Sequence, residues 1–305
     1  MKGPRVPVAT AATLAAAALW GTSFIANDYG LLGADASTFA ALRFAVAAAS
    51  CWVVLAVVEP AAVRAAPWRS HLPWTLGGLT AAAFLLQYLG QEITTPARTA
   101  LFVNANVFTV ALLQLVVQRS RPPAGMIAFA AVAVAGVAVL TLSSRDATLE
   151  GGSLLGDALA FGGGAAWAFY AIGAKRAVGS SSALALTTWT FTGAAIVLAP
   201  IAVVGGDGIP TGAVAWAAIL YTGLLCSTLA YVLWSWGLRG LSPTASAVVL
   251  LVEVPVATAL SVALGLDRVT AATAAGAALL FAGVAGASVI EARSEAKREG
   301  PGAAT

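Results

Sequence analysis

Residues 243–265 read PTASAVVLLVEVPVATALSVALG, an uninterrupted apolar run with one charged side chain, that of Glu253. A helix needs about 20 mostly apolar residues to cross a bilayer, so this run is long enough to span one. Ser242 precedes Pro243, and a hydroxyl cap followed by a first-turn proline is a typical helix start. The stretch therefore predicts a transmembrane helix with an acidic group about midway along it.

The whole chain has the composition of a membrane protein. Of its 305 residues 60% are hydrophobic and 10% are charged, whereas a soluble domain carries about 25% charged residues. Its mean hydropathy is +0.89, and the short alternating strands of an outer-membrane barrel are missing. We expect an all-α integral membrane protein with ten transmembrane helices, near residues 8–27, 37–58, 74–92, 98–117, 124–142, 153–174, 183–204, 213–235, 243–265 and 270–290.

The basic residues are sorted between the two sides of the membrane. With the N-terminus inside, the outer segments hold only Arg98, Arg145 and Arg268 of the 16 basic residues. The positive-inside rule then places both termini in the cytoplasm, as an even number of helices requires, in a multi-pass protein of the cell inner (cytoplasmic) membrane. Such a distribution does not form a nucleic-acid-binding face. The inner segments hold Lys2, Arg5, Arg64, Arg69, Arg119, Arg121, Lys175, Arg176, Arg239, Arg293, Lys297 and Arg298.

The chain matches itself when it is shifted by 147 residues, from position 20 to position 167. Trp20 then falls on Trp167 and Pro96 on Pro243, without a gap. This predicts two five-helix repeats, residues 1–147 and 148–290, followed by a disordered cytoplasmic tail at 291–305. Because five is odd, the second repeat should be inverted about an axis in the membrane plane, as in many secondary transporters. A duplication kept only for packing remains the alternative.

Polar groups at mid-depth in a membrane are costly, so they mark candidate functional sites. Under the repeat, Glu253 falls on Asn106, so both halves place a polar group at the same depth. Pro255 also removes a backbone N–H, which leaves a carbonyl near Leu251 in need of another partner. Asn104 and Asn106 are two residues apart and share no helix face, so we expect at most one of them in a cavity.

Other candidates come from the neighbouring helices. Gln87 and Gln91 share one face of the third helix, and Trp20 and Trp167 lie at mid-depth, where they could form a wall for an apolar or aromatic substrate. Arg43 lies near the outer end of its helix, where we expect a structural role. A packing role is the alternative for each candidate. The candidate substrate-binding residues are Trp20, Gln87, Gln91, Asn106, Trp167, Tyr170, Tyr231, Trp234 and Glu253.

Several stretches together resemble the EamA-type ten-helix members of the drug/metabolite transporter superfamily. They are Leu19–Phe24, Leu42–Phe44, Gly156–Ala158, Trp167–Tyr170, Ser227–Tyr231 and the run from Leu241 through Glu253–Pro255 and Leu264–Arg268 to Val284. The resemblance covers the chain up to about residue 290. It implies a secondary transporter that exports amino acids or related small metabolites by alternating access, with a site at mid-depth between the repeats.

The alternative functions are a membrane-embedded enzyme and a structural or receptor-like membrane protein. The chain has one histidine, its two cysteines fall within apolar spans, and it contains no P-loop, so we expect neither enzymatic activity nor a cofactor or metal. The expected partners are a small-molecule substrate and membrane lipid. Glu253 could hold a coupling proton, bind a substrate ammonium group or only fix the packing of its helix.

Overall fold

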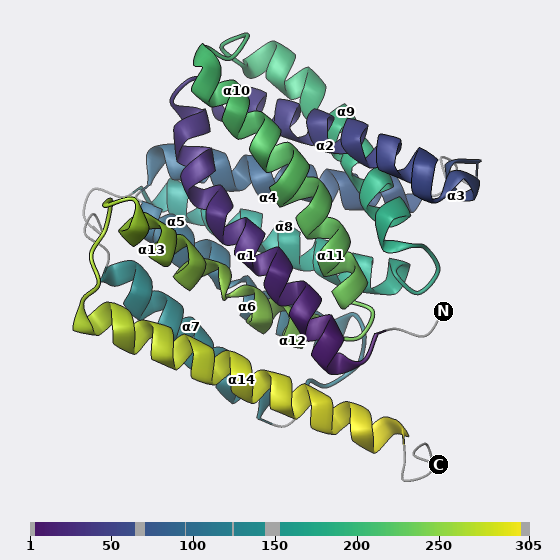
Figure 1. Cartoon of the computed structure of the whole chain (residues 1–305), viewed down its shortest axis with the longest axis vertical. Coiled ribbons are helices and arrows are strands. Elements are labelled where there is room, and N and C mark those ends of the chain that lie inside the picture. Colours follow the sequence, from purple (N-terminus) through teal and green to yellow (C-terminus); the bar gives the residue numbers. More distant parts are fainter. Residues whose placement is uncertain (1–3, 65–70, 95, 124, 144–152, 300–305) are drawn as a thin grey trace.

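The computed structural model describes residues 4–64, 71–94, 96–123, 125–143 and 153–299, and these residues form helices joined by short connections (Figure 1). Seven helical segments are long and apolar enough to cross a membrane, as expected for a multi-pass membrane protein. The helices are α1 (Val6–Leu31), α2 (Ala36–Val58), α3 (Pro60–Arg64), α4 (His71–Ile93), α5 (Pro96–Asn104), α6 (Asn106–Val116), α7 (Met126–Leu142), α8 (Leu154–Ala177), α9 (Ala183–Gly205), α10 (Gly212–Tyr221), the π-helix η1 (Thr222–Leu229), α11 (Ala230–Gly237), α12 (Pro243–Leu250), α13 (Glu253–Ala263) and α14 (Ala271–Glu299).

Each apolar range expected from the sequence is occupied by one helix or by consecutive helices. The differences lie inside three of the ranges. The range 98–117 is divided between α5 and α6, and the range 243–265 between α12 and α13. In the range 213–235, the π-helix η1 connects α10 to α11. Continuous apolar composition therefore predicted where the helices are, but not where they are interrupted.

Many large apolar side chains lie exposed on the outer faces of the helices. Large side chains such as Val53 and Val57 of α2, Val203 and Val204 of α9, and Phe281 of α14 are exposed. Exposed apolar surface on this scale is unusual for a soluble monomer and is typical of a surface covered by lipid.

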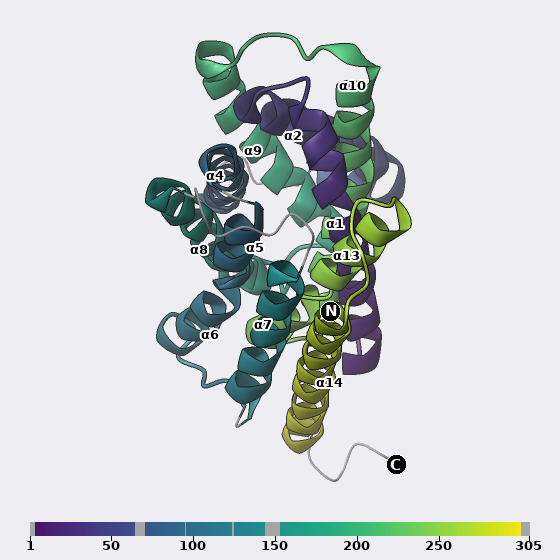
Figure 2. The same cartoon turned by 90° about the vertical axis from the view of Figure 1, so that its left-hand side faces the viewer.

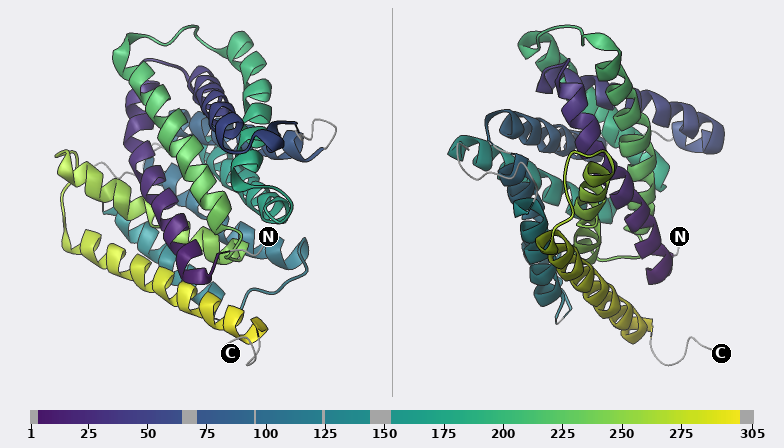
Figure 3. Two further views of the ribbon diagram at one scale, coloured as in Figure 1. Left: turned by 45° about the vertical axis from the view of Figure 1, so that its right-hand side comes forward. Right: turned by 60° about the vertical axis from the view of Figure 1, so that its left-hand side comes forward.

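The most extensive helix contacts join the two halves of the sequence. α4 packs along α8, and α1 packs along α11. These two contacts are equivalent, because the 147-residue shift places α1 on α8 and the end of α4 on α11. α2 packs on α9, and α7 lies beside α14 along one edge of the molecule (Figures 2 and 3). Each half of the sequence therefore packs mainly against helices of the other half.

The contact between α7 and α14 depends on two glycines that the repeat relates. A Cβ at Gly136 would lie 2.4 Å from the backbone nitrogen of Leu280, and one at Gly283 would lie 2.5 Å from that of Ala133. Real Cβ atoms do not approach so closely, so glycine is required at both positions. Small residues of this kind allow membrane helices to pack through their backbones. The two contacts are equivalent, because Ala133 and Leu280 also correspond under the shift.

The ends of several helices are fixed by side-chain caps. Asp35 accepts hydrogen bonds from the backbone nitrogens of Ser37 (3.0 Å), Thr38 (2.9 Å) and Asp207 (2.9 Å). Partial burial raises the pKa of this carboxyl, but these bonds outweigh that effect and hold it well below its usual range. The bond to Asp207 also joins the start of α2 to the segment between α9 and α10.

The start of α12 is as predicted, since the hydroxyl of Ser242 accepts a hydrogen bond from the nitrogen of Ala245 (3.3 Å) and Pro243 occupies the first turn. The equivalent cap at Thr95 lies outside the described residues.

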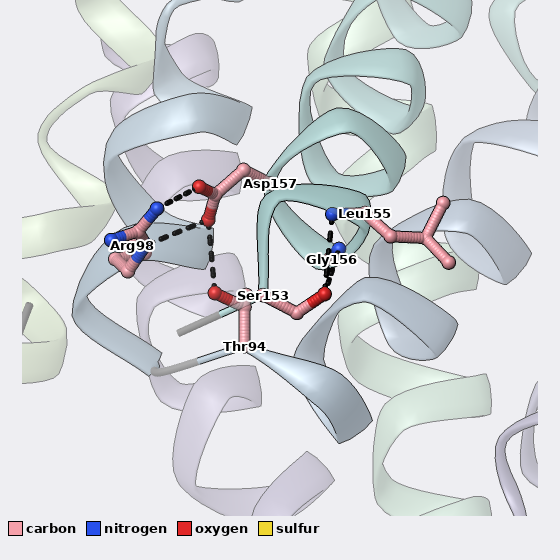
Figure 4. A network of polar contacts seen from close by, with 6 residues as sticks. All are labelled: Thr94, Arg98, Ser153, Leu155, Gly156 and Asp157. Carbon is pink, nitrogen blue, oxygen red and sulfur yellow. Dashed lines mark hydrogen bonds and ion pairs between the residues drawn. The ribbon is translucent and has the colours of Figure 1, made fainter. Parts of the chain in front are cut away.

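The first turn of α8 is held against α4 and α5 by a polar network (Figure 4). Ser153 caps the helix, and the Asp157 carboxylate accepts hydrogen bonds from the Thr94 hydroxyl (2.9 Å) and from the Arg98 guanidinium, with which it forms an ion pair. These contacts lie at the end of the molecule where α4 ends and α5 and α8 begin.

Most of the range expected to be a disordered tail is helical. α14 continues through the region expected to be disordered after residue 290, and residues 300–305 lie outside the described part of the chain. The Glu291 carboxylate accepts hydrogen bonds from the nitrogen (2.6 Å) and the hydroxyl (3.0 Å) of Ser242. Glu295 accepts one from the nitrogen of Val6 (3.4 Å). These contacts anchor the helix and place the start of α1 beside the end of α14.

Two adjacent glycines in α4 allow a test of this packing. A Cβ at Gly77 would lie 2.7 Å from the backbone of α9 at Gly193 and Ala194, whereas a Cβ at Gly78 would have nothing within 4 Å. We expect Gly77→Ala to lower stability by about 1–3 kcal/mol through overpacking. Gly78→Ala, the matched control, should leave stability unchanged or raise it, because alanine favours helix. The measurement is the unfolding temperature of each purified variant in detergent, and equal values for the two would contradict the contact.

Candidate functional site

A cavity of about 80 Å³ lies between α1, α2, α4, α8, α11 and the divided helices. One water molecule needs about 10–15 Å³ measured in the same way, so there is room for more than a single water. Both halves contribute to its walls. The residues that line this central cavity are Trp20, Ser23, Phe24, Asn27, Arg43, Ala83, Phe84, Gln87, Val103, Asn104, Asn106, Gly163, Gly164, Trp167, Tyr231, Leu250 and Glu253.

The two divided helices are interrupted at equivalent positions, and both interruptions reach the central cavity. α6 begins at Asn106 and α13 begins at Glu253, residues that the 147-residue shift superposes. α5 ends at Asn104 and α12 at Leu250. Polar side chains at the start of a half-helix, facing a cavity, are the arrangement that membrane transporters use to bind solutes.

The backbone at these interruptions tightens and remains hydrogen-bonded. The nitrogen of Phe108 donates to the carbonyl of Ala105 (3.1 Å) in the first half, and that of Val254 donates to the carbonyl of Leu251 (3.1 Å) in the second. These are bonds between residues three apart, as in a 3₁₀ turn. Pro255 was expected to leave the Leu251 carbonyl in need of another partner, and the Val254 nitrogen is that partner in this tighter turn.

The interruption also changes where the two asparagines point. Asn104 and Asn106 both line the central cavity, although at most one of them was expected there. The expectation assumed a continuous helix, in which residues two apart face different sides. Because the helix is interrupted at Ala105, both side chains reach the same space. Asn104 is also buried, and its amide donates to the carbonyl of Ala100 (2.9 Å).

Aromatic rings form one wall of the central cavity. The rings of Trp20 and Trp167 lie 6.4 Å apart and perpendicular, and the Trp20 ring lies 4.9 Å from that of Tyr231. Trp20 is fixed by its indole N–H, which donates to the carbonyl of Cys226 in η1 (2.6 Å). This satisfies the one polar atom of a buried ring and leaves its apolar surface for the cavity.

The remaining candidates separate into cavity-lining residues and residues outside the lining. Gln87 lines the cavity, whereas Gln91 lines a smaller neighbouring pocket and donates to Asp28 (3.1 Å). Trp234 and Tyr170 are fully buried, and their rings stack 5.6 Å apart behind the wall. Neither of these two rings lines the cavity. Trp234 packs against Trp20 and Trp167 and so supports the wall from behind.

Arg43 is the main residue that sequence reasoning placed wrongly. It was expected to have a structural role near the outer end of its helix, but the residue is 1% exposed and lines the central cavity. The guanidinium donates to the hydroxyls of Ser227 (2.9 Å) and Tyr88 (2.7 Å) and to the amide oxygen of Asn27 (3.4 Å). The sequence did contain a signal, because a charged residue inside an apolar span is a functional candidate in its own right.

The central cavity thus combines an apolar aromatic wall, several amides, one guanidinium and one carboxyl group. Such a surface suits reversible binding of a small polar molecule with an apolar portion. Within the described part of the chain, no group of three His, Cys, Asp or Glu side chains is placed to hold a metal ion.

The apolar helices are those of a multi-pass membrane protein. Residues 8–142, and again residues 154–289, match the EamA-like transporter family, and the chain belongs to this family. The double match agrees with the internal repeat.

Individual relatives agree with this assignment. A protein of Archaeoglobus fulgidus, described as an uncharacterized transporter, is 28% identical over 236 residues, which are 75% of this chain and 80% of that protein. The Bacillus subtilis protein described as uncharacterized transporter YyaM is 26% identical over 212 residues, 67% of this chain and 68% of its own. One crystal structure shares the fold with a TM-score of 0.80 at 19% identity, over 96% of this chain and 100% of that one.

Proposed function

We propose that the protein is a secondary transporter that exports amino acids or related small metabolites by alternating access, with the central cavity as its substrate site. The observation that carries this proposal is the meeting of two equivalent helix interruptions at one cavity lined by both halves. Substrate sites in repeat-built transporters lie at such junctions, because the repeats can move against each other around them. The export direction is the one implied by the resemblance to EamA-type transporters.

In this proposal ten segments cross the membrane. Seven helical segments are long and apolar enough to cross a membrane, and α4, α7 and α8 bring the number to ten. The second half is then inverted relative to the first, and both termini lie in the cytoplasm at the inner membrane. The hydrogen bond between Glu295 and Val6 supports this topology, because it brings the start of α1 and the end of α14 to the same side.

Glu253 is the group through which transport is coupled to a proton. It lines the central cavity, where a substrate ammonium group and a proton would compete for its carboxylate. Release of one then favours binding of the other. The aromatic wall and the amides contact the rest of the substrate.

The direct test is transport by the purified protein in liposomes, with the twenty amino acids and a panel of other small metabolites. We expect uptake or efflux of at least one amino acid, at a rate that depends on pH. Empty liposomes are the control. If no solute in the panel crosses faster than in empty liposomes, the proposed function is wrong.

The role of Glu253 is tested in the same assay by Glu253→Gln, which keeps the size of the side chain but removes its titration. We expect a flatter pH dependence and weaker binding of amine-bearing substrates. The matched control is Glu59→Gln, beyond the end of α2, which should resemble the wild type. A Glu253→Gln protein with wild-type rate, affinity and pH profile would leave Glu253 with a packing role.

The aromatic wall is tested by Trp167→Ala, which removes a cavity-lining ring. We expect at least about tenfold weaker substrate affinity, because aromatic rings dominate contacts of this kind. Trp236→Ala, on the partly exposed face of α11, removes the same ring type from a position that does not line the cavity. Its affinity should stay near the wild-type value, and equal losses in both variants would argue against the wall.

The topology is tested by single cysteines at exposed positions, one at Asp207 between α9 and α10 and one at Arg64 at the end of α3. In intact cells, an impermeant thiol reagent should label the first and not the second. The native Cys51 and Cys226 are buried and should not react. Labelling of Arg64→Cys but not of Asp207→Cys would show that the topology is the reverse of the proposed one.

A further inference from the structure

Arg43 carries a buried positive charge that forms no ion pair with any residue the structure describes. Its three hydrogen-bond partners, Ser227, Tyr88 and Asn27, are all uncharged, and among the described residues no ion pair includes Arg43. A buried charge is normally paired with an opposite one, because removing it from water is costly. The cost is therefore expected to be offset by something that enters the cavity.

The hydrogen bonds of Arg43 fix its orientation and leave one of its nitrogens without a partner among the described residues. Nε and Nη1 hold the neutral partners, and the Phe84 ring lies 4.8 Å from the central carbon of the guanidinium. Nη2 has no hydrogen-bond partner in the part of the chain that the structure describes. The side chain is thus held rigidly at the cavity with one donor group unused. A guanidinium in this state is suited to a carboxylate or a phosphate.

The other charged group of the cavity decides between these two anions. Arg43 is the one basic residue among the cavity-lining residues, and Glu253 is the one acidic residue. A phosphate would bring up to two negative charges beside one cation and a carboxylate, whereas a carboxylate brings a single charge. The pairing of one cation with one acid matches a zwitterion, whose carboxylate meets Arg43 and whose ammonium group meets Glu253.

We propose that Arg43 is the carboxylate-binding residue of the central cavity, so that the substrate class is a zwitterionic α-amino acid with an apolar or aromatic side chain. The inference rests on the proposed function, since it requires the central cavity to be the substrate site. Arg43 then selects for the carboxylate, Glu253 for the ammonium group, and the wall of Trp20, Trp167 and Tyr231 for the side chain.

The test uses L-phenylalanine as the probe and two analogues that each lack one charge. Phenylalaninamide keeps the ammonium group and has no carboxylate, and 3-phenylpropionate keeps the carboxylate and has no ammonium group. Each competes with uptake of radiolabelled L-phenylalanine into liposomes that contain the wild-type protein. We expect both analogues to compete more than about tenfold less well than phenylalanine, because each leaves one buried charge unpaired. A wild-type protein that does not distinguish phenylalanine from its amide would overturn the proposal without any mutation.

Arg43→Gln then assigns the selectivity to one residue. In this variant the preference for phenylalanine over its amide should shrink towards unity, while the preference over 3-phenylpropionate is kept. Glu253→Gln should show the opposite pattern. Arg43→Lys keeps the charge and should keep part of the preference. Size-exclusion profiles establish that each variant is folded, and a folded Arg43→Gln with the full preference for the carboxylate would refute the role of Arg43.

The outcome also separates this inference from the proposed function. If the wild-type protein moves other metabolites but no amino acid, the protein is a transporter and the assignment of Arg43 to a zwitterion is wrong. If no solute in the panel moves at all, the proposed function itself fails.

Discussion

In a lipid environment every backbone N–H and C=O group must find a partner within the protein, and the rest of this structure depends on that constraint. It explains why the chain is helical and why departures from regular helix are confined. The two interruptions, at Ala105 and at Leu251–Val252, occur where the backbone borders the central cavity. Even there the chain tightens so that the carbonyls of Ala105 and Leu251 remain bonded. The polar ends of the half-helices are thereby collected around one space.

Close helix packing transmits this arrangement to the walls of the cavity. A Cβ at Gly90 would meet the carbonyl of Gly156 at 2.8 Å, and one at the equivalent Gly237 would meet that of Ala9 at the same distance. These contacts set α4 against α8 and α11 against α1. The same four helices carry Gln87, Trp167, Tyr231 and Trp20 to the cavity. The positions of these side chains therefore depend on backbone contacts that bulkier residues would not permit.

The sequence predicted the helical ranges well, because an apolar run of this length is rare outside a helix that crosses a bilayer. It did not predict the interruption at Asn104–Asn106, since that segment contains neither proline nor glycine. The burial of Arg43 was not predicted, because the position of a residue along a helix does not reveal which neighbouring helices cover it. For a related reason the sequence did not show that Tyr170 and Trp234 lie behind the wall. A helix that is apolar all round has no periodicity that identifies its inner face.

The two repeats differ where α5 and α8 begin. The ion pair between Arg98 and Asp157 joins these helices, and the corresponding positions in the other half are Ala245 and Thr10, which carry no charge. The Arg98 side chain is 20% exposed, so dissolved ions can screen its attraction to Asp157. The start of α8 is thus held by an ion pair that weakens with ionic strength, and the other half has no charged residues at the corresponding positions.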